Sequence, residues 1–233
     1  MDRLEQINAN LQRKHATPAD TSRPIGQLIG HLETEAMPAR LCDDNKRPII
    51  RPWQSPYSRW PATDETPDWD KIDASLLAML RECMNGAHRW PLVIHGTRGT
   101  GKTYAGRLMT TYFGGWIGTL AELATTRNLA TRGELWAKGT DRSINELDWW
   151  DHWQACPLVV VDEIGLRTKE TDARYETLHT AIDKRVGKPS IHMSNLTLPE
   201  LALLYDDRIG SRFGGGTIFK IDGADRRLNR GER

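Results

Sequence analysis

A glycine-rich loop at residues 96–103 limits the folds open to this chain more than any other segment does. It directly follows the apolar run Leu92–Ile94 and fits the pattern G-x-x-x-x-G-K-[ST]. Such a loop turns backbone N–H groups toward an anion, and the N-terminus of a following helix adds favourable partial charge. Lys102 would contact the β- and γ-phosphates of a nucleotide, and the Thr103 hydroxyl would bind Mg²⁺. The predicted phosphate-binding residues are Gly96, Thr97, Arg98, Gly99, Thr100, Gly101, Lys102 and Thr103.

Composition excludes several classes of protein. The three cysteines, Cys42, Cys83 and Cys156, form no C-x-x-C pair, which argues against a zinc site or disulfide framework and favours unreactive thiols in a reducing compartment. No apolar run approaches the roughly 18–20 residues that cross a bilayer, and the first residues lack a signal-peptide layout. We therefore expect a cytoplasmic protein without membrane contact. The net charge of +1 does not indicate a globally basic nucleic-acid binder.

The apolar pattern divides the chain into two parts. Residues 1–14 have the spacing of a short amphipathic helix, and residues 17–68 carry recurrent prolines with aromatic residues between them, so this part is expected to be irregular. From residue 70 onward, helical and strand patterns alternate, which indicates a parallel sheet with helices on both faces. We predict an N-terminal extension over 1–69 and an α/β domain over 70–233.

Individual elements of the α/β domain follow from the same pattern. Strands are predicted over 91–95, 115–118, 158–161, 190–193 and 217–221. Helices are predicted over 70–85, 102–112, 120–129, 172–186, 198–203 and 206–213. Residues 130–154 have no clear periodicity, and their tryptophans are expected to pack over the sheet, with an exposed surface as the alternative: Trp136, Trp149, Trp150 and Trp153.

Polar side chains follow two of the predicted strands. Asp162 and Glu163 come directly after the apolar run 158–161, where a carboxylate beside the phosphate loop can hold Mg²⁺ through its water shell. We assign Asp162 to Mg²⁺ and Glu163 to the activation of an attacking water, which is general-base chemistry. Asn195 follows the strand 190–193 and would orient that water if this strand lies between the other two. Alone, it is more typical of a helix cap.

Two arginines lie four residues apart on one face of a predicted helix. Arg208 and Arg212 could stabilise the charge that develops on a phosphate held by a neighbouring subunit. Equally, they could be surface arginines that pair with Asp206 or Asp207. The residues alone favour neither interpretation.

Taken in order, these segments resemble the AAA+ ATPases, and within them the DnaC-like helicase loaders and the IstB-like transposition proteins. The resemblance covers about 70–228 and rests on 96–103, 158–165 (LVVVDEIG), 181–196 (AIDKRVGKPSIHMSNL), 208–213 (RIGSRF) and 223–227 (GADRR). It implies a three-layer P-loop NTPase sandwich with a five-stranded parallel sheet and no C-terminal helical lid domain.

The same resemblance implies roles for single residues. Asn195 matches the first sensor position, Arg212 matches the arginine finger that completes a neighbour's site, and Arg227 falls where the family has a nucleotide-contacting arginine. Two departures stand out. Arg98 replaces the small residue or proline usual in the loop, and Asp225-Arg226 replaces the usual Ser-Tyr before the last arginine.

The resemblance also implies a function. We expect an ATP hydrolase with ATP and Mg²⁺ as cofactors, which forms a homo-oligomer in its ATP state, binds single-stranded DNA and helps to load a replicative hexameric helicase contacted through residues 1–70. The alternative is a transposition helper ATPase that assembles on duplex DNA, which the motifs do not distinguish from a loader. A small-molecule kinase is less favoured, because Asp162 and Glu163 together with Asn195 and Arg212 fit hydrolysis better than transfer to an alcohol.

Overall fold

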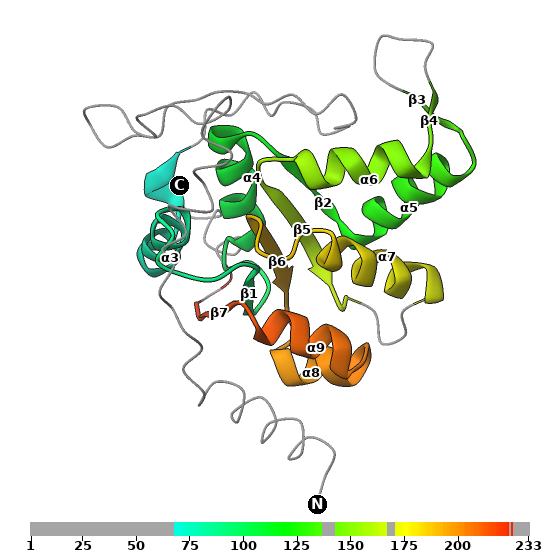
Figure 1. Ribbon diagram of the computed structural model, residues 1–233. Coiled ribbons are helices and arrows are strands. Elements are labelled where there is room, and N and C mark those ends of the chain that lie inside the picture. The colour runs from blue at the N-terminus through cyan, green and yellow to red at the C-terminus, as the bar shows by residue number, and fades with distance from the viewer. Residues whose placement is uncertain (1–67, 137–142, 167–170, 224, 226–233) are drawn as a thin grey trace, which may run out of the picture.

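The computed structural model describes residues 68–136, 143–166, 171–223 and 225 (Figure 1). The predicted helix over 1–14, nearly all of the proline-rich segment, Cys42 and Arg227 lie outside these residues. The proposed domain boundary at residue 69/70 therefore stays a prediction. No helix of the described part has the length and apolar character that crossing a bilayer requires.

A five-stranded sheet with the order β2-β5-β6-β1-β7 forms the centre of the molecule. Every pair of neighbouring strands is parallel, so the carboxyl ends of all five strands lie along one edge. The five predicted strands are confirmed, with ends that differ by a few residues at most: β1 (Leu92–Gly96), β2 (Trp116–Thr119), β5 (Val159–Ile164), β6 (Ser190–Ser194) and β7 (Thr217–Ile221).

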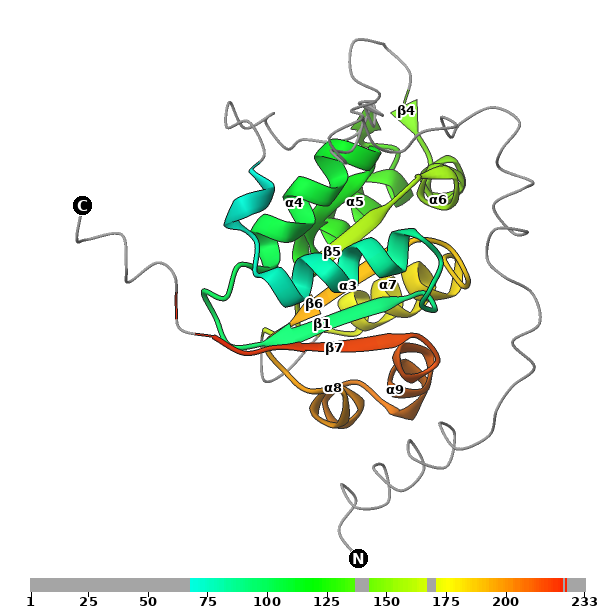
Figure 2. The same cartoon turned by 90° about the vertical axis from the view of Figure 1, so that its left-hand side faces the viewer.

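Helices cover both faces of this sheet, as Figure 2 shows with α3 in front of the strands and α7 behind them. A short 3-10 helix, Trp69–Lys71, precedes α3. The six predicted helices are present, and α6 is an addition to them. Their bounds are α3 (Ala74–Met84), α4 (Lys102–Phe113), α5 (Leu120–Thr131), α6 (Glu146–Ala155), α7 (Asp172–Asp183), α8 (Leu198–Leu204) and α9 (Asp207–Gly214).

Two hydrophobic cores form because successive side chains of a strand point to opposite faces. On β1, Leu92 and Ile94 pack with α3 and α4, whereas Val93 packs on the other face with the core that α5, α6, α7, α8 and α9 complete. Val160 and Val161 on β5 divide between the two faces in the same way. A strand covered on both faces has no polar side, which explains the continuous apolar run at 158–161.

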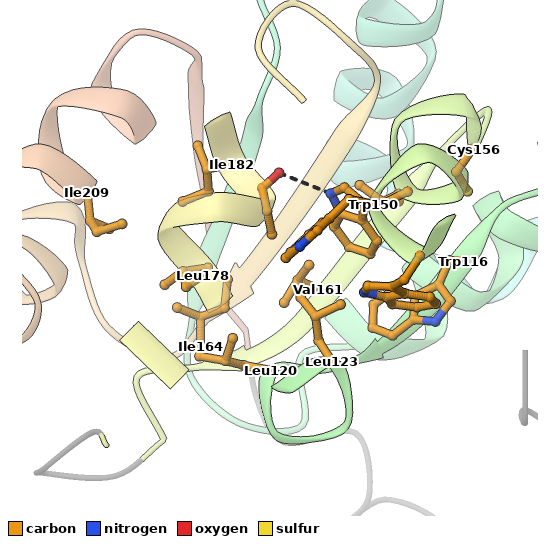
Figure 3. Close-up of a cluster of buried hydrophobic side chains, with 14 of the residues drawn as sticks. Trp116, Leu120, Leu123, Trp150, Cys156, Val161, Ile164, Leu178, Ile182 and Ile209 are labelled. Carbon is orange, nitrogen blue, oxygen red and sulfur yellow. Dashed lines mark hydrogen bonds between the residues drawn. The ribbon is translucent and has the colours of Figure 1, made fainter. Parts of the chain in front are cut away.

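Three of the four tryptophans in the segment without clear periodicity lie in the second core (Figure 3). The Trp153 ring lies 5.3 Å from Trp116, 6.4 Å from Trp149 and 6.3 Å from Trp150, measured between centroids, and its indole N–H donates to the Ala181 carbonyl at 3.0 Å. Core packing is thus confirmed for these three. It is wrong for Trp136, which is 57% exposed on the short hairpin of β3 (Leu135–Trp136) and β4 (Ser143–Ile144).

A buried arginine fixes the end of α6. The Arg185 guanidinium donates to five backbone carbonyls, those of Trp153, Gln154, Cys156, Pro157 and Pro189. Burial lowers the pKa of Arg185 to about 10, so the group remains charged at neutral pH. The free carbonyls at a helix C-terminus carry partial negative charge, which this cation offsets.

The two described cysteines are unreactive, as predicted. Burial raises the pKa of the Cys83 thiol to about 12 and that of Cys156 to about 11. Since the thiolate is the reactive form, neither thiol is available as a nucleophile at neutral pH.

Candidate functional site

The glycine-rich loop joins the carboxyl end of β1 to the first turn of α4. Gly96 has φ 153° and lies against β7, so that a Cβ at this position would be 2.1 Å from the Ile221 carbonyl oxygen. Gly101 has φ 97° and is the N-cap of α4. Any other residue at Gly96 would collide with the neighbouring strand, so the loop requires glycine there for packing as well as for its turn. The strand-loop-helix context that the motif requires is therefore present.

Lys102 lies at the centre of the loop and is only 7% exposed. Its ammonium group donates to the carbonyl oxygens of Gly96 at 2.7 Å and Thr97 at 2.8 Å, and to Asn195 Oδ1 at 3.1 Å. Asn195 follows β6, which lies between β1 and β5 as expected. The structure thus brings together two predicted site residues that are 93 positions apart in the chain.

Thr103 and Asp162 form a second contact at the same edge of the sheet. The Thr103 hydroxyl donates to Asp162 Oδ2 at 2.6 Å, and Asp162 is 8% exposed. A hydroxyl and a carboxylate at this separation are oxygen ligands of the kind that Mg²⁺ prefers when nucleotide phosphates complete its coordination. The donor set therefore fits the predicted metal ion, with Thr103 and Asp162 as the groups that would hold it.

Glu163 has an unusual backbone conformation. Its φ of 57° is the only positive value among the described residues other than glycine, and the pairing of β5 with β6 shifts register between Val161 and Ile164. Such a bulge re-aims a side chain, and strained residues of this kind gather at functional sites. Asp162 is buried whereas Glu163 is exposed, so the bulge gives the two carboxylates different environments.

Two side chains to which the sequence analysis assigned no role form hydrogen bonds with the backbone next to this bulge. The Ser194 hydroxyl donates to the Ile164 carbonyl at 2.7 Å and accepts from the Leu196 N–H at 2.9 Å. The Gly165 N–H donates to the Tyr205 hydroxyl at 3.2 Å. Ser194 could have been identified as the last residue of the strand that presents Asn195; nothing in the local sequence indicates the role of Tyr205.

Arg212 does not join this cluster. Together with Trp90, Pro91 and Ser190 it lines a pocket of about 220 Å³ at the amino ends of β1 and β6, the edge opposite the glycine-rich loop. Both Arg208 and Arg212 border a second open pocket of about 420 Å³ with His179, Asp207 and Ser211, which confirms that they share a face.

The arginine pairing considered from the sequence is wrong for Arg212. Its guanidinium pairs with Asp183, the last residue of α7, with Nη2 donating to Oδ2 at 2.9 Å. Asp206 instead caps α9 by accepting the Ile209 N–H at 2.9 Å, and it also accepts a hydrogen bond from the Tyr175 hydroxyl at 2.6 Å. A partner on another helix, 29 positions away, has no signal in the local sequence.

The segment after β7 crosses the glycine-rich loop. The Thr97 hydroxyl donates to the Gly223 carbonyl at 3.4 Å, and a Cβ at Gly99 would lie 1.8 Å from Asp225 Oδ1. A carboxylate therefore lies against the loop that is predicted to bind phosphate. Arg98, the other departure from the family pattern, is exposed on the same loop.

Comparison with solved structures finds this fold in replication proteins. One is a DNA replication initiation factor, with 16% identity and a TM-score of 0.54 over 69% of this chain and 51% of that chain. Another is DnaA from Aquifex aeolicus with AMPPCP bound, with 18% identity and a TM-score of 0.51 over 67% of this chain and 49% of that chain. DnaI matches with 17% identity and a TM-score of 0.52 over 71% of this chain and 96% of that chain.

This chain spans about half the length of the first two of these proteins. No protein-family model matches the sequence, and no curated protein does. At identities below 20% the likeness shows the fold alone. The described part of the chain shares its fold with these replication proteins, and the five-stranded parallel sheet between helices that the resemblance implied is confirmed.

Proposed function

We propose that this chain is an ATP-hydrolysing AAA+ protein that acts in DNA replication as a helicase loader. The observation that carries the proposal is the convergence of Lys102, Asn195, Thr103 and Asp162 at the carboxyl edge of the sheet, beside Glu163. These are the groups that phosphate binding, water activation and metal binding require, in the places where parallel strands put them. The fold shared with DnaA and DnaI supports the role in replication.

In this proposal the loop amides and Lys102 bind the phosphates of ATP. When ATP binds, the Lys102 ammonium group would leave the carbonyl oxygens of Gly96 and Thr97 and donate to phosphate oxygens instead. The conformation of the loop would then depend on the bound nucleotide. Mg²⁺, held through Thr103 and Asp162, would neutralise charge on the β- and γ-phosphates. Glu163 accepts a proton from a water that Asn195 orients, a bond forms between that water oxygen and the γ-phosphorus, and ADP departs.

Arg212 would act on a neighbouring subunit. The five residues of β1 extend over roughly 16 Å, at about 3.3 Å per residue, between the edge where Arg212 lies and the loop that binds phosphate. Arg212 therefore cannot reach the phosphates of its own subunit, whereas a second copy can bring its loop to this surface. This arrangement supports the proposal of a homo-oligomer in the ATP state.

A hydrolysis assay with and without single-stranded DNA and a hexameric helicase tests the proposal. We expect ATP turnover that both additions change, with no phosphorylated acceptor. Glu163→Gln should bind ATP normally and lose turnover at least 100-fold, as expected for the loss of a general base, while Glu176→Gln, an exposed control on α7, should keep it. Stimulation by duplex DNA without any response to a helicase would favour the transposition helper, and a failure to bind ATP would overturn the proposal.

A further inference from the structure

The ion pair between Arg212 and Asp183 has a defined geometry. The Arg212 Nη2 donates a hydrogen bond to Asp183 Oδ2, and Nε lies against Oδ1 as an ion-pair contact without a hydrogen bond, so one edge of the guanidinium faces the carboxylate. The two side chains are about one-third exposed, at 37% and 34%. Because Asp183 contacts one edge of the planar guanidinium, it restricts the plane of that group. The N–H donors on the opposite edge can then bind a ligand.

That ligand would enter the open pocket of about 420 Å³ that Arg212 lines with His179, Arg208, Ser211 and the carboxylate-bearing Asp207. Two arginines, an imidazole and a hydroxyl provide donors for an oxyanion such as the γ-phosphate of a nucleotide held by a second copy of the chain. The orientation of Arg212 at the border of this pocket then determines how well it meets that phosphate.

Asp183 lies on a rigid part of the molecule. It ends α7 directly after Ile182, which is 3% exposed, and two residues before Arg185, which is held by five carbonyls. His179, one turn earlier, lies with Nδ1 3.7 Å from Asp183 Oδ2 and stacks on Tyr175. The Asp183 carboxylate is therefore held in place, and it can restrict the orientation of the long, flexible Arg212 side chain.

Holding α9 against the domain would be the simpler role for this pair, but other contacts already hold that helix. The Tyr175 hydroxyl donates to Asp206 at 2.6 Å, at the first turn of α9. Phe213, next to Arg212, is fully buried, with its ring centroid 5.0 Å from His192. These contacts hold both ends of α9 without Asp183.

We propose that Asp183 is a positioning residue for Arg212: its ion pair with one edge of the guanidinium sets that group in the orientation that meets the γ-phosphate bound by the neighbouring subunit. The inference rests on the proposed function, because it requires that Arg212 acts in trans. It assigns to the Asp-Lys-Arg stretch at 183–185 two separate tasks, since Asp183 orients Arg212 and Arg185 anchors the helix end behind it.

Mixed assemblies of full-length subunits test separately whether Arg212 acts on a neighbouring subunit and whether Asp183 positions it. An acceptor subunit carrying Arg212→Ala keeps its own Glu163 but offers no finger, and a donor carrying Glu163→Gln offers Arg212 but cannot hydrolyse. Mixing them should restore ATP hydrolysis at least tenfold above either alone. If it does not, the trans role of Arg212 fails, and with it the basis of the inference.

Donors with a second substitution then test Asp183 itself. A Glu163→Gln donor that also carries Asp183→Asn should restore less than a tenth of the kcat of the mixture, at unchanged KM for ATP. A donor with Asp183→Glu should restore an intermediate kcat. A donor with Tyr175→Phe, which removes the hydrogen bond from α7 to Asp206 at the start of α9, should restore it fully.

Full restoration by the Asp183→Asn donor would overturn the inference while leaving the trans role intact. Thermal unfolding of each donor shows whether a lower kcat arises only because the substitution destabilises the fold. Should Asp183→Asn lower the melting temperature, the Asp183→Glu donor decides, because it keeps the charge and displaces it by one methylene. A donor with Asp183→Glu that melts normally and restores kcat completely would also contradict the proposal.

Discussion

Replacing His192 with leucine should reduce the loss of stability of the fold between pH 7.5 and pH 5. His192 lies on β6 between Val93 of β1 and Val161 of β5, and it is fully buried. Neither ring nitrogen has a hydrogen-bond partner within the described residues. Burial, with a smaller contribution from the charge of Arg185, lowers the pKa of His192 to about 3.

The size and sign of the effect follow from this shift. The unfolded chain binds the proton near pH 6.5 and the folded protein only near pH 3, so acid favours unfolding throughout that interval. Stability is complete above pH 6.5 and declines as the pH falls. Between pH 7.5 and pH 5, protonation of His192 in the unfolded chain raises the unfolding equilibrium constant by about 1.5 powers of ten. This corresponds to a loss of about 2 kcal/mol in the free energy of unfolding. At pH 7.5 leucine should be neutral or stabilising, because it replaces a buried group without a partner.

Urea unfolding followed by tryptophan fluorescence at pH 7.5 and pH 5 measures this difference. The wild-type chain should lose about 2 kcal/mol more than His192→Leu between the two conditions. His88→Gln is the control for the removal of a histidine as such, because His88 is not buried in the core and pairs with Glu82. An equal loss in His192→Leu and the wild type would refute the reasoning, since it would mean that His192 is protonated or hydrated in the folded protein.

Three further predictions concern the candidate site. Glu163→Gly should abolish ATP hydrolysis yet raise the free energy of unfolding by about 1 kcal/mol, because glycine accepts the φ of 57° without strain; urea unfolding and a turnover assay report the two effects. Thr103→Val removes the hydroxyl that contacts Asp162 and should weaken ATP binding in calorimetry only when Mg²⁺ is present. Asp225→Asn removes a negative charge beside Gly99 and should tighten ATP binding severalfold at low salt, with the gain shrinking as ionic strength rises.

The sequence was sufficient for those features that local signals determine. The loop at 96–103 has a fixed spacing, and the strand at 158–161 is apolar because it is covered on both faces. Their order along the chain then placed Asn195 beside Lys102, because parallel strands carry their carboxyl ends to one edge of the sheet. Predictions of this kind need only periodicity and topology.

Other features depend on contacts between distant residues and could not be predicted. Helix α6 was missed because its three tryptophans interrupt the polar face, although Asn145 does cap it by accepting the Asp148 N–H. The bulge at Glu163 depends on how β5 aligns with β6, which no local pattern encodes. The partner of Arg212 likewise lies on another helix, whereas the sequence offered only Asp206 or Asp207 as local partners.

The contact between Gly96 and β7 has a consequence for biosynthesis. The glycine-rich loop contacts β7 at Gly96 and the residues after β7 at Thr97, and these partners are made much later, since 126 positions separate Thr97 from Gly223. At about 5–20 residues per second, a ribosome needs roughly 6–25 s to cover that distance. A nascent chain halted before Thr217 would carry the whole motif but no β7 for its first glycine to lie against. The proposed nucleotide binding would therefore require a chain whose translation has passed β7.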